Sequence, residues 1–112
     1  MPLPLRRVVV SGPSMAPTLH ADDVLLVRWR PGRITPAVGD VVVVDLPGGR
    51  PLSVKRVTAI TPDGLRIEGD NPSGSTDSRD FGAVAVAAVR GRVLFRLWPR
   101  PGRLARCAQP PR

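Results

Sequence analysis

Residues 11–19 read Ser11-Gly12-Pro13-Ser14-Met15-Ala16-Pro17-Thr18-Leu19 and directly follow the apolar run of residues 8–10. This order places Ser14 just after a predicted strand. Pro13 and Pro17 restrict φ and each removes a backbone donor, so the turn that carries Ser14 is stiff and continues neither a sheet nor a helix. A rigid, exposed hydroxyl is a candidate nucleophile, although an ordinary proline-rich turn explains the same residues.

The positive charges of the chain point to a second candidate residue. Of the 17 Lys and Arg residues, only Lys55 is a lysine, and it stands in the apolar run Ser53-Val54-Lys55-Arg56-Val57. A lysine can lose its proton in a protein, whereas an arginine cannot. A single lysine among arginines therefore suggests chemistry that needs a neutral amine, with chance as the alternative.

A serine nucleophile needs a base, and the sequence offers Lys55, His20 or a carboxylate. At its ordinary pKa of about 10.4, a lysine is almost fully protonated at pH 7. Burial among the valines of residues 41–44, 54 and 57 would lower the Lys55 pKa by desolvating its charge. His20 lies beyond Pro17 and is expected on the surface, but it stays open as the alternative base.

The fold class follows from apolar runs that contain no proline. A chain of 112 residues is one domain with a small core, and its few aromatic residues leave packing to Val, Leu, Ile and Ala. The sequence predicts a mostly β protein with few or no helices, built as a small antiparallel sheet or partly open barrel. The predicted strands are residues 8–10, 24–29, 41–44, 52–60, 65–68 and 93–98, with hairpin turns at 47–49 and 61–64.

The sequence also predicts a division of the chain into one domain and a tail. Residues 1–98 are predicted to form the functional domain, and residues 99–112 a basic, proline-rich tail that is disordered. Residues 86–89 are the only helical candidate. Residues 41–44 are apolar on both faces and are therefore expected inside the core.

Net charge and composition limit the classes of partner that the chain is expected to bind. The net charge of +8 favours anionic surfaces, but the arginines are spread along the chain and few aromatic residues are available for base stacking. Nucleic acid is therefore an unlikely partner, while peripheral contact with an anionic membrane remains open. One cysteine, Cys107, and one histidine predict no disulfide, metal site or cofactor, and Pro72 interrupts the only segment that could be a calcium loop.

Location is left open by the sequence. No run approaches the ~20 apolar residues of a membrane span, and residues 1–7 lack the apolar part of a signal peptide. As written, the chain is expected to be soluble and cytoplasmic. It would be membrane-associated if an anchor preceded the written start.

Four segments together resemble a known family. They are Ser-Met-Ala-Pro-Thr-Leu at 14–19, Val-Gly-Asp-Val-Val at 38–42, Val-Lys-Arg-Val at 54–57, and Gly-Asp-Asn-Pro-Ser-Gly-Ser-Thr-Asp-Ser-Arg-Asp-Phe-Gly at 69–82. Their order resembles that of the type I signal peptidases, peptidase family S26. Within this family the chain looks most similar to the short peptidases that mature nickel superoxide dismutase. Self-cleaving SOS repressors share the Ser-Met and the lysine, but not the last segment.

The resemblance implies a serine endopeptidase with a Ser/Lys dyad that removes a signal peptide or propeptide from a protein substrate. In this reading Ser14 attacks the scissile carbonyl, Lys55 accepts its proton, and Ser75 orients the lysine. The backbone N–H of Ser14 would be one oxyanion donor, but Gly12 occupies the position of the other, which leaves Ser11 as a weak candidate. The supporting residues implied by the family segments are Arg56 with Asp70, Asp77 with Arg79, and Asn71.

The resemblance also implies where the substrate binds. Family members bind it as an added strand, with small side chains at the first and third positions before the cut. The flanking segments here would be Val9, Val10 and Ser11 on one side and Leu52 and Ser53 on the other, with Met15 under the first pocket. Two other readings stay open, a self-cleaving regulatory domain and a non-catalytic basic β module.

Overall fold

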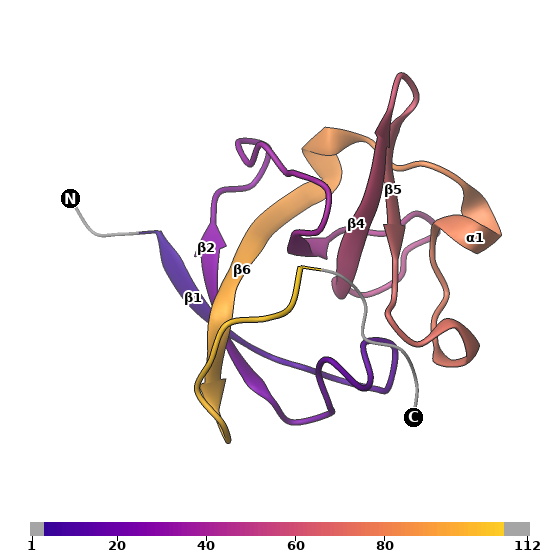
Figure 1. The fold of residues 1–112 in the computed structure, drawn as a ribbon. Coiled ribbons are helices and arrows are strands. Elements are labelled where there is room, and N and C mark those ends of the chain that lie inside the picture. Colours follow the sequence, from indigo (N-terminus) through magenta and orange to yellow (C-terminus); the bar gives the residue numbers. More distant parts are fainter. Residues whose placement is uncertain (1–3, 107–112) are drawn as a thin grey trace.

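The computed structural model describes residues 4–106 and consists mainly of one antiparallel sheet (Figure 1). Its six strands are adjacent in the order β1-β2-β6-β3-β4-β5. They are β1 (Leu5–Val9), β2 (Val24–Trp29), β3 (Val41–Val44), β4 (Ser53–Thr61), β5 (Gly64–Glu68) and β6 (Val89–Trp98). The predicted fold class is confirmed, because the sheet is open and helices are few and short.

Strand β3 is buried on both faces because each face of the sheet carries its own apolar core. All four of its valines are buried, as the sequence predicted. Val42 and Val44 belong to one core, and Val41 and Val43 to the other. The first core also contains Ile34, Leu46, Val57, Leu65, Ile67, Val84 and Val89; the second contains Val10, Met15, Leu19, Leu25, Val27 and Val93.

Strand β6 joins the two halves of the sheet, pairing with β2 on one side and with β3 on the other. It begins at Val89, four residues before the predicted start, because Arg90, Gly91 and Arg92 break the apolar pattern that the prediction relied on. Gly91 is required by space, since an added Cβ would collide with Val27 and with the carbonyl of Arg28. The predicted helical turn just before this strand is a 3-10 turn, Val86–Ala88.

Two hairpins place the inner strand β4 between β3 and β5. The predicted turns at 47–49 and 61–64 join β3 to β4 and β4 to β5, and both strand pairs are antiparallel. In the β3–β4 register Lys55 lies opposite Val42 and Arg56 lies opposite Val41. The only two charged residues in this part of β4 are therefore held between apolar neighbours, one on each face of the sheet.

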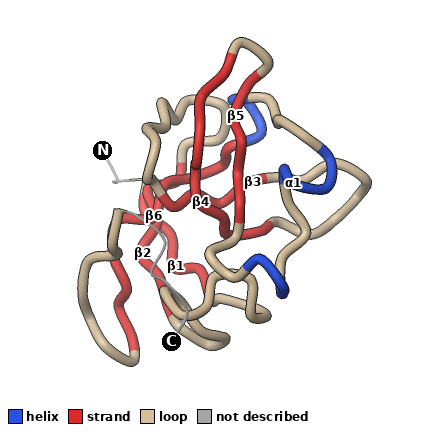
Figure 2. The backbone as a smooth tube through the Cα atoms, turned by 45° about the vertical axis from the view of Figure 1, so that its right-hand side comes forward, coloured by secondary structure: helices blue, strands red, loops and turns tan. Residues whose placement is uncertain are grey.

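Three short helical segments lie in the loops (Figure 2). They are the 3-10 turns Pro72–Gly74 and Val86–Ala88 and the helix α1 (Ser78–Phe81). The sequence did not predict α1. Its start is fixed by a capping box, in which Asp77 accepts from the Arg79 N–H and Asp80 accepts from the Asp77 N–H.

The segment after β6 differs from the predicted disordered tail as far as residue 106. Gly102 forms a bridge with Arg96, and Leu104 packs against the second core. The carbonyl of Ala105 accepts a hydrogen bond from Arg56 Nη1 at 2.7 Å. Cys107 and the rest of the predicted tail lie outside the described residues. Within residues 4–106, no helix has the length and hydropathy of a membrane span.

Candidate active site

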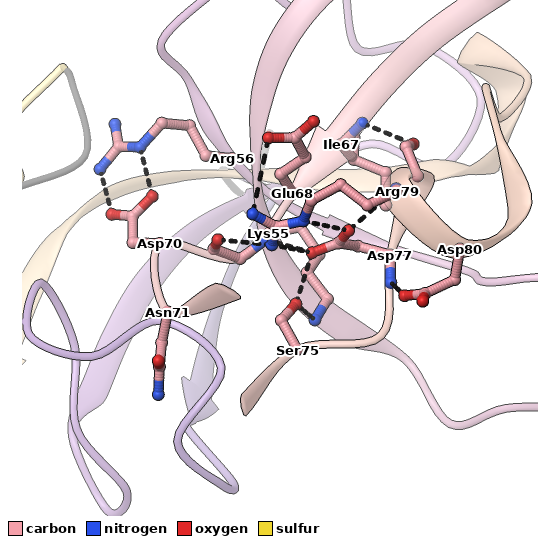
Figure 3. Close-up of polar contacts among 12 residues, drawn as sticks. Lys55, Arg56, Ile67, Glu68, Asp70, Asn71, Ser75, Asp77, Arg79 and Asp80 are labelled. Atoms are coloured by element: carbon pink, nitrogen blue, oxygen red, sulfur yellow. Dashed lines mark hydrogen bonds and ion pairs between the residues drawn. The ribbon is translucent and has the colours of Figure 1, made fainter. Parts of the chain in front are cut away.

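Lys55 lies on β4, an inner strand between β3 and β5, and points toward the loop that follows β5 (Figure 3). Its side chain is buried, with the residue 3% exposed, and its Nζ donates to Ser75 Oγ at 2.7 Å. Burial lowers the pKa of Lys55 below the ordinary 10.5, and nearby Asp77 partly opposes this whereas Arg79 adds to it. The site therefore favours the neutral amine more than water does.

Ser75 links Lys55 to the buried carboxylate of Asp77 by hydrogen bonds. Its hydroxyl donates to Asp77 Oδ2 at 2.6 Å, and the same oxygen accepts from Arg79 Nη2 at 2.6 Å and from the Gly69 N–H at 2.8 Å. Burial alone would raise the pKa of Asp77, but these hydrogen bonds hold it well below its usual range. Asp77 is thus a fixed anion whose position orients Ser75, a link that the sequence did not reveal.

Asn71, on the loop that follows β5, anchors the turn that carries Ser14. The Asn71 N–H donates to the Ser14 carbonyl at 2.9 Å, and Asn71 Nδ2 donates to the Pro13 carbonyl at 3.0 Å. Leu19 N–H closes the turn on the Met15 carbonyl at 2.9 Å. The sequence predicted an exposed Ser14, but the residue is half-buried. Among the described residues, Ser14 Oγ makes no hydrogen bond to Lys55 Nζ, so the expected direct contact of the dyad is absent from this geometry.

Gly69 shows how closely the two serines approach each other. A Cβ built on Gly69 would stand within 3.0 Å of both the Ser14 carbonyl oxygen and Ser75 Oγ, closer than real Cβ atoms come. Both atoms therefore crowd the same Cα from the side where a side chain would project. The turn that carries Ser14 and the hydroxyl that holds Lys55 meet at this glycine.

A buried ion pair between Arg56 and Asp70 also joins β4 to the loop after β5. Arg56 donates to Asp70 through Nε at 2.9 Å and Nη2 at 2.8 Å, and both side chains are almost completely buried. Thr18 Oγ1, on the Ser14 turn, donates to the same carboxylate at 2.5 Å. The sequence paired Arg56 with Asp70 but missed Thr18, because a threonine in a turn carries no signal of a distant partner.

A groove of about 270 Å³ lies beside the Ser14 turn. It is lined by all the residues that the sequence placed at the substrate: Val9, Val10, Ser11, Ser14, Met15, Leu52 and Ser53. Trp29, Val43 and Val54 also line it, and the sequence missed them because their strand pattern reads as core. Val9 and Leu52 are 60% and 50% exposed. Apolar surface is therefore available to an incoming chain.

The alternative base lies in a different place. His20 is exposed and lines a separate cavity of about 570 Å³ with Thr18, Asp23 and Arg96, whereas Ser14 lines the groove. No cluster of three His, Cys, Asp or Glu side chains suited to a metal occurs within residues 4–106. Ser11 and Gly12 are both exposed beside the groove.

Comparison with known proteins identifies the family of the chain. Residues 3–71, which include Ser14 and Lys55, match the family model described as signal peptidase, peptidase S26. Mitochondrial inner membrane protease subunit 1 of Xenopus tropicalis is 34% identical over 82% of this chain and 68% of its own length. Mitochondrial ATP-independent inner membrane protease subunit 1b of Arabidopsis thaliana is 34% identical over 79% of this chain and 67% of its own length. Subunit 2 of the mitochondrial inner membrane protease of Danio rerio is 36% identical over 80% of this chain and 62% of its own length. The chain therefore belongs to the S26 family of signal peptidases.

Proposed function

We propose that the protein is a serine endopeptidase in which Ser14 is the nucleophile and the neutral amine of Lys55 is the general base. One observation carries the proposal. The single lysine of the chain is buried and bonded to Ser75, and Ser75 Oγ and the Ser14 carbonyl crowd the same side of Gly69. An amine with a lowered pKa beside a serine turn is the arrangement that activates a hydroxyl without a histidine.

The proposed reaction uses the two residues in both of its steps. Ser14 Oγ attacks the carbonyl carbon of the peptide bond while Lys55 Nζ takes the hydroxyl proton. The resulting ammonium gives that proton to the leaving amine, and the acyl group stays on Ser14. Lys55 then takes a proton from a water molecule that attacks the ester, and its ammonium returns that proton to Ser14 Oγ as the bond to the acyl group breaks. The Ser14 N–H is the first proposed oxyanion donor.

Ser75 and Asp77 have positioning roles in this scheme. Because Ser75 Oγ donates its proton to Asp77, its lone pairs face Lys55 and accept one N–H of the amine. This contact directs the Lys55 lone pair elsewhere, and we propose that it points to Ser14 once substrate fills the groove. Catalytic hydrogen bonds that are long in a free enzyme shorten when substrate binds.

The substrate class follows from the groove. Its two walls come from residues at the end of β1 and from residues 51–54, where β4 starts. We propose that an extended protein segment lies between them by backbone pairing, with small side chains before the cut, as in a signal peptide or propeptide. The propeptide of a nickel superoxide dismutase stays a predicted substrate from the sequence resemblance. Peripheral contact with an anionic membrane also stays a prediction.

Replacement of Ser14 tests the proposal. Ser14→Ala should abolish cleavage of a peptide with small residues before the cut. Its unfolding midpoint should stay close to that of the wild type, because Ser14 Oγ has no hydrogen-bond partner among the described residues. Thr58→Ala, which removes an exposed hydroxyl outside the groove, is the matched control and should keep full activity. Cleavage by Ser14→Ala would remove the nucleophile, and peptide binding without cleavage by the wild type would indicate a non-catalytic module.

A further inference from the structure

Four arginines line one small cavity at the end of β2. Arg28, Arg30, Arg33 and Arg92 surround a space of about 210 Å³ together with Ile34 and Thr35. No acidic residue lines this cavity. Ile34 is buried and gives it an apolar floor. One water molecule takes up about 30 Å³, so the space has room for a phosphate or diphosphate group.

The four guanidinium groups lack protein partners, unlike most of the other arginines. Within residues 4–106, none of them makes a side-chain hydrogen bond or an ion pair. By contrast, six other arginines each have a carboxylate within 4.0 Å: Arg56, Arg66, Arg79, Arg90, Arg96 and Arg106. The charge at this cavity is therefore concentrated and uncompensated.

Two of these arginines lie directly opposite each other on adjacent strands. Arg28 on β2 and Arg92 on β6 are direct cross-strand partners. Directly opposed like charges destabilise an antiparallel pair, since their Cβ atoms lie only about 5 Å apart. An anion between the two guanidinium groups would turn this repulsion into attraction.

The other two arginines stand on a rigid turn. Arg33 N–H donates to the Arg30 carbonyl at 2.9 Å, with Pro31 and Gly32 between them and Gly32 at φ +72°. The turn is also tied to β6, because Arg30 N–H donates to the Arg90 carbonyl and Gly32 N–H donates to the Val89 carbonyl. The chain therefore holds the backbone of these two residues in place, and no acidic side chain lines the cavity beside them.

From these observations we infer that the cavity binds a phosphate-type oxyanion, either a free phosphate ester or the headgroup of an anionic lipid. The planar guanidinium fork matches phosphate oxygens and binds them in pairs. The site is separate from the proposed substrate groove. Trp29 lines that groove, and its neighbour on β2, Arg28, projects from the opposite face of the strand.

Pyrophosphate binding by the full chain tests the inference, with calorimetry and the unfolding midpoint as readouts at constant ionic strength. The wild type should bind pyrophosphate saturably and unfold at a higher temperature in its presence. Arg28→Gln/Arg92→Gln should bind at least about tenfold more weakly, because two guanidinium groups that would donate charge-assisted hydrogen bonds to the anion are lost. The matched control Arg7→Gln/Arg103→Gln removes the same charge outside this cavity and should bind like the wild type.

A vesicle arm separates the two sources of phosphate. Co-sedimentation compares vesicles of phosphatidylcholine and phosphatidylglycerol with vesicles of phosphatidylcholine alone. Binding to the anionic vesicles that pyrophosphate competes away, and that Arg28→Gln/Arg92→Gln loses, identifies a lipid headgroup. Pyrophosphate binding without vesicle binding identifies a free phosphate ester. Equal weakening in both double variants, or no saturable binding by the wild type, overturns the inference. Peptide cleavage should be unchanged in Arg28→Gln/Arg92→Gln, so this result and the proposed function fail independently.

Discussion

Lys55 is the residue on which the proposed chemistry depends, and its position is unfavourable for a charged side chain. It is 3% exposed and its nearest hydrogen-bond partner is the neutral hydroxyl of Ser75, not a carboxylate. A buried charge without a direct ion pair costs free energy, which a protein reduces by lowering the pKa of the group. The fold thus gives up stability at neutral pH to hold an amine that can lose its proton.

This cost leads to a prediction for Lys55→Met. The folded pKa lies below 10.5, so between that pKa and 10.5 the unfolded chain binds more protons than the folded protein. The free energy of unfolding of the wild type therefore rises with pH through this window. Lys55→Met lacks this titration and should be at least as stable as the wild type at pH 7, with a smaller difference near pH 10.

Urea unfolding of both proteins across this pH range measures the difference. The variant should also be inactive on the peptide substrate. A variant less stable than the wild type by the same amount at every pH would show that Lys55 is not penalised by burial.

At the residue scale, the sequence pointed to the main candidate residues but not to all of the contacts between them. Lys55 was identifiable because it is the only lysine, and the family-like segments supplied Ser75 and the Asp77–Arg79 pair. The hydroxyl bond from Ser75 to Asp77 and the bond from Thr18 to Asp70 were not predicted. Such contacts depend on which loops meet in space, and local composition does not encode that meeting.

At the scale of elements, the site depends on the fit between the Ser14 turn and the loop after β5. Asn71 holds the turn through two backbone carbonyls, and Gly69 allows the two segments to touch. The glycine is needed for space and not for conformation, because an added Cβ would collide with the Ser14 carbonyl and Ser75 Oγ. Any side chain here should push Ser14, the proposed nucleophile, away from Lys55, the proposed base.

Gly69→Ala should therefore reduce activity more than stability. Overpacking of this kind costs about 1–3 kcal/mol of folding free energy. A displacement of about 1 Å at the reacting atoms can lower the rate by about 100-fold. The measurements are kcat on the peptide substrate and the unfolding midpoint.

Gly102→Ala is the matched control, because nothing lies within 4 Å of an added Cβ at Gly102. It should change neither quantity. Gly69→Ala with unchanged kcat and a lowered midpoint would show that the contact at Gly69 serves folding alone.

Elements were predicted best where apolar patterning decides them. The bounds of β2 and β3 match the predicted runs, since β3 is entirely apolar and β2 is apolar except for Arg28. Strand β6 began earlier than predicted because its first half is rich in Arg and Gly, and it is held there by pairing with β2 and β3. The helix α1 was missed because one turn of helix depends on its cap, not on periodicity.

The whole molecule works as a scaffold that brings distant segments together. A single sheet with a core on each face holds β4 in its interior, so Lys55 is buried where a surface strand would leave it exposed. Arg56 connects β4 with Asp70, Gly39 and Ala105, which ties the loop after β5 and the chain beyond β6 to the same strand. The fold thus fixes Lys55, whereas Ser14 Oγ makes no hydrogen bond within residues 4–106.

The pH dependence of kcat/KM is the most direct measurement of whether Lys55 is a neutral base. The account predicts that kcat/KM rises with pH along one limb, whose apparent pKa lies below 10.5 and is the same in His20→Ala. Lys55→Arg should be as inactive as Lys55→Met, because arginine keeps the charge but cannot accept the proton. An active Lys55→Arg enzyme, or a limb in the histidine range that disappears in His20→Ala, would contradict the account and make His20 the base.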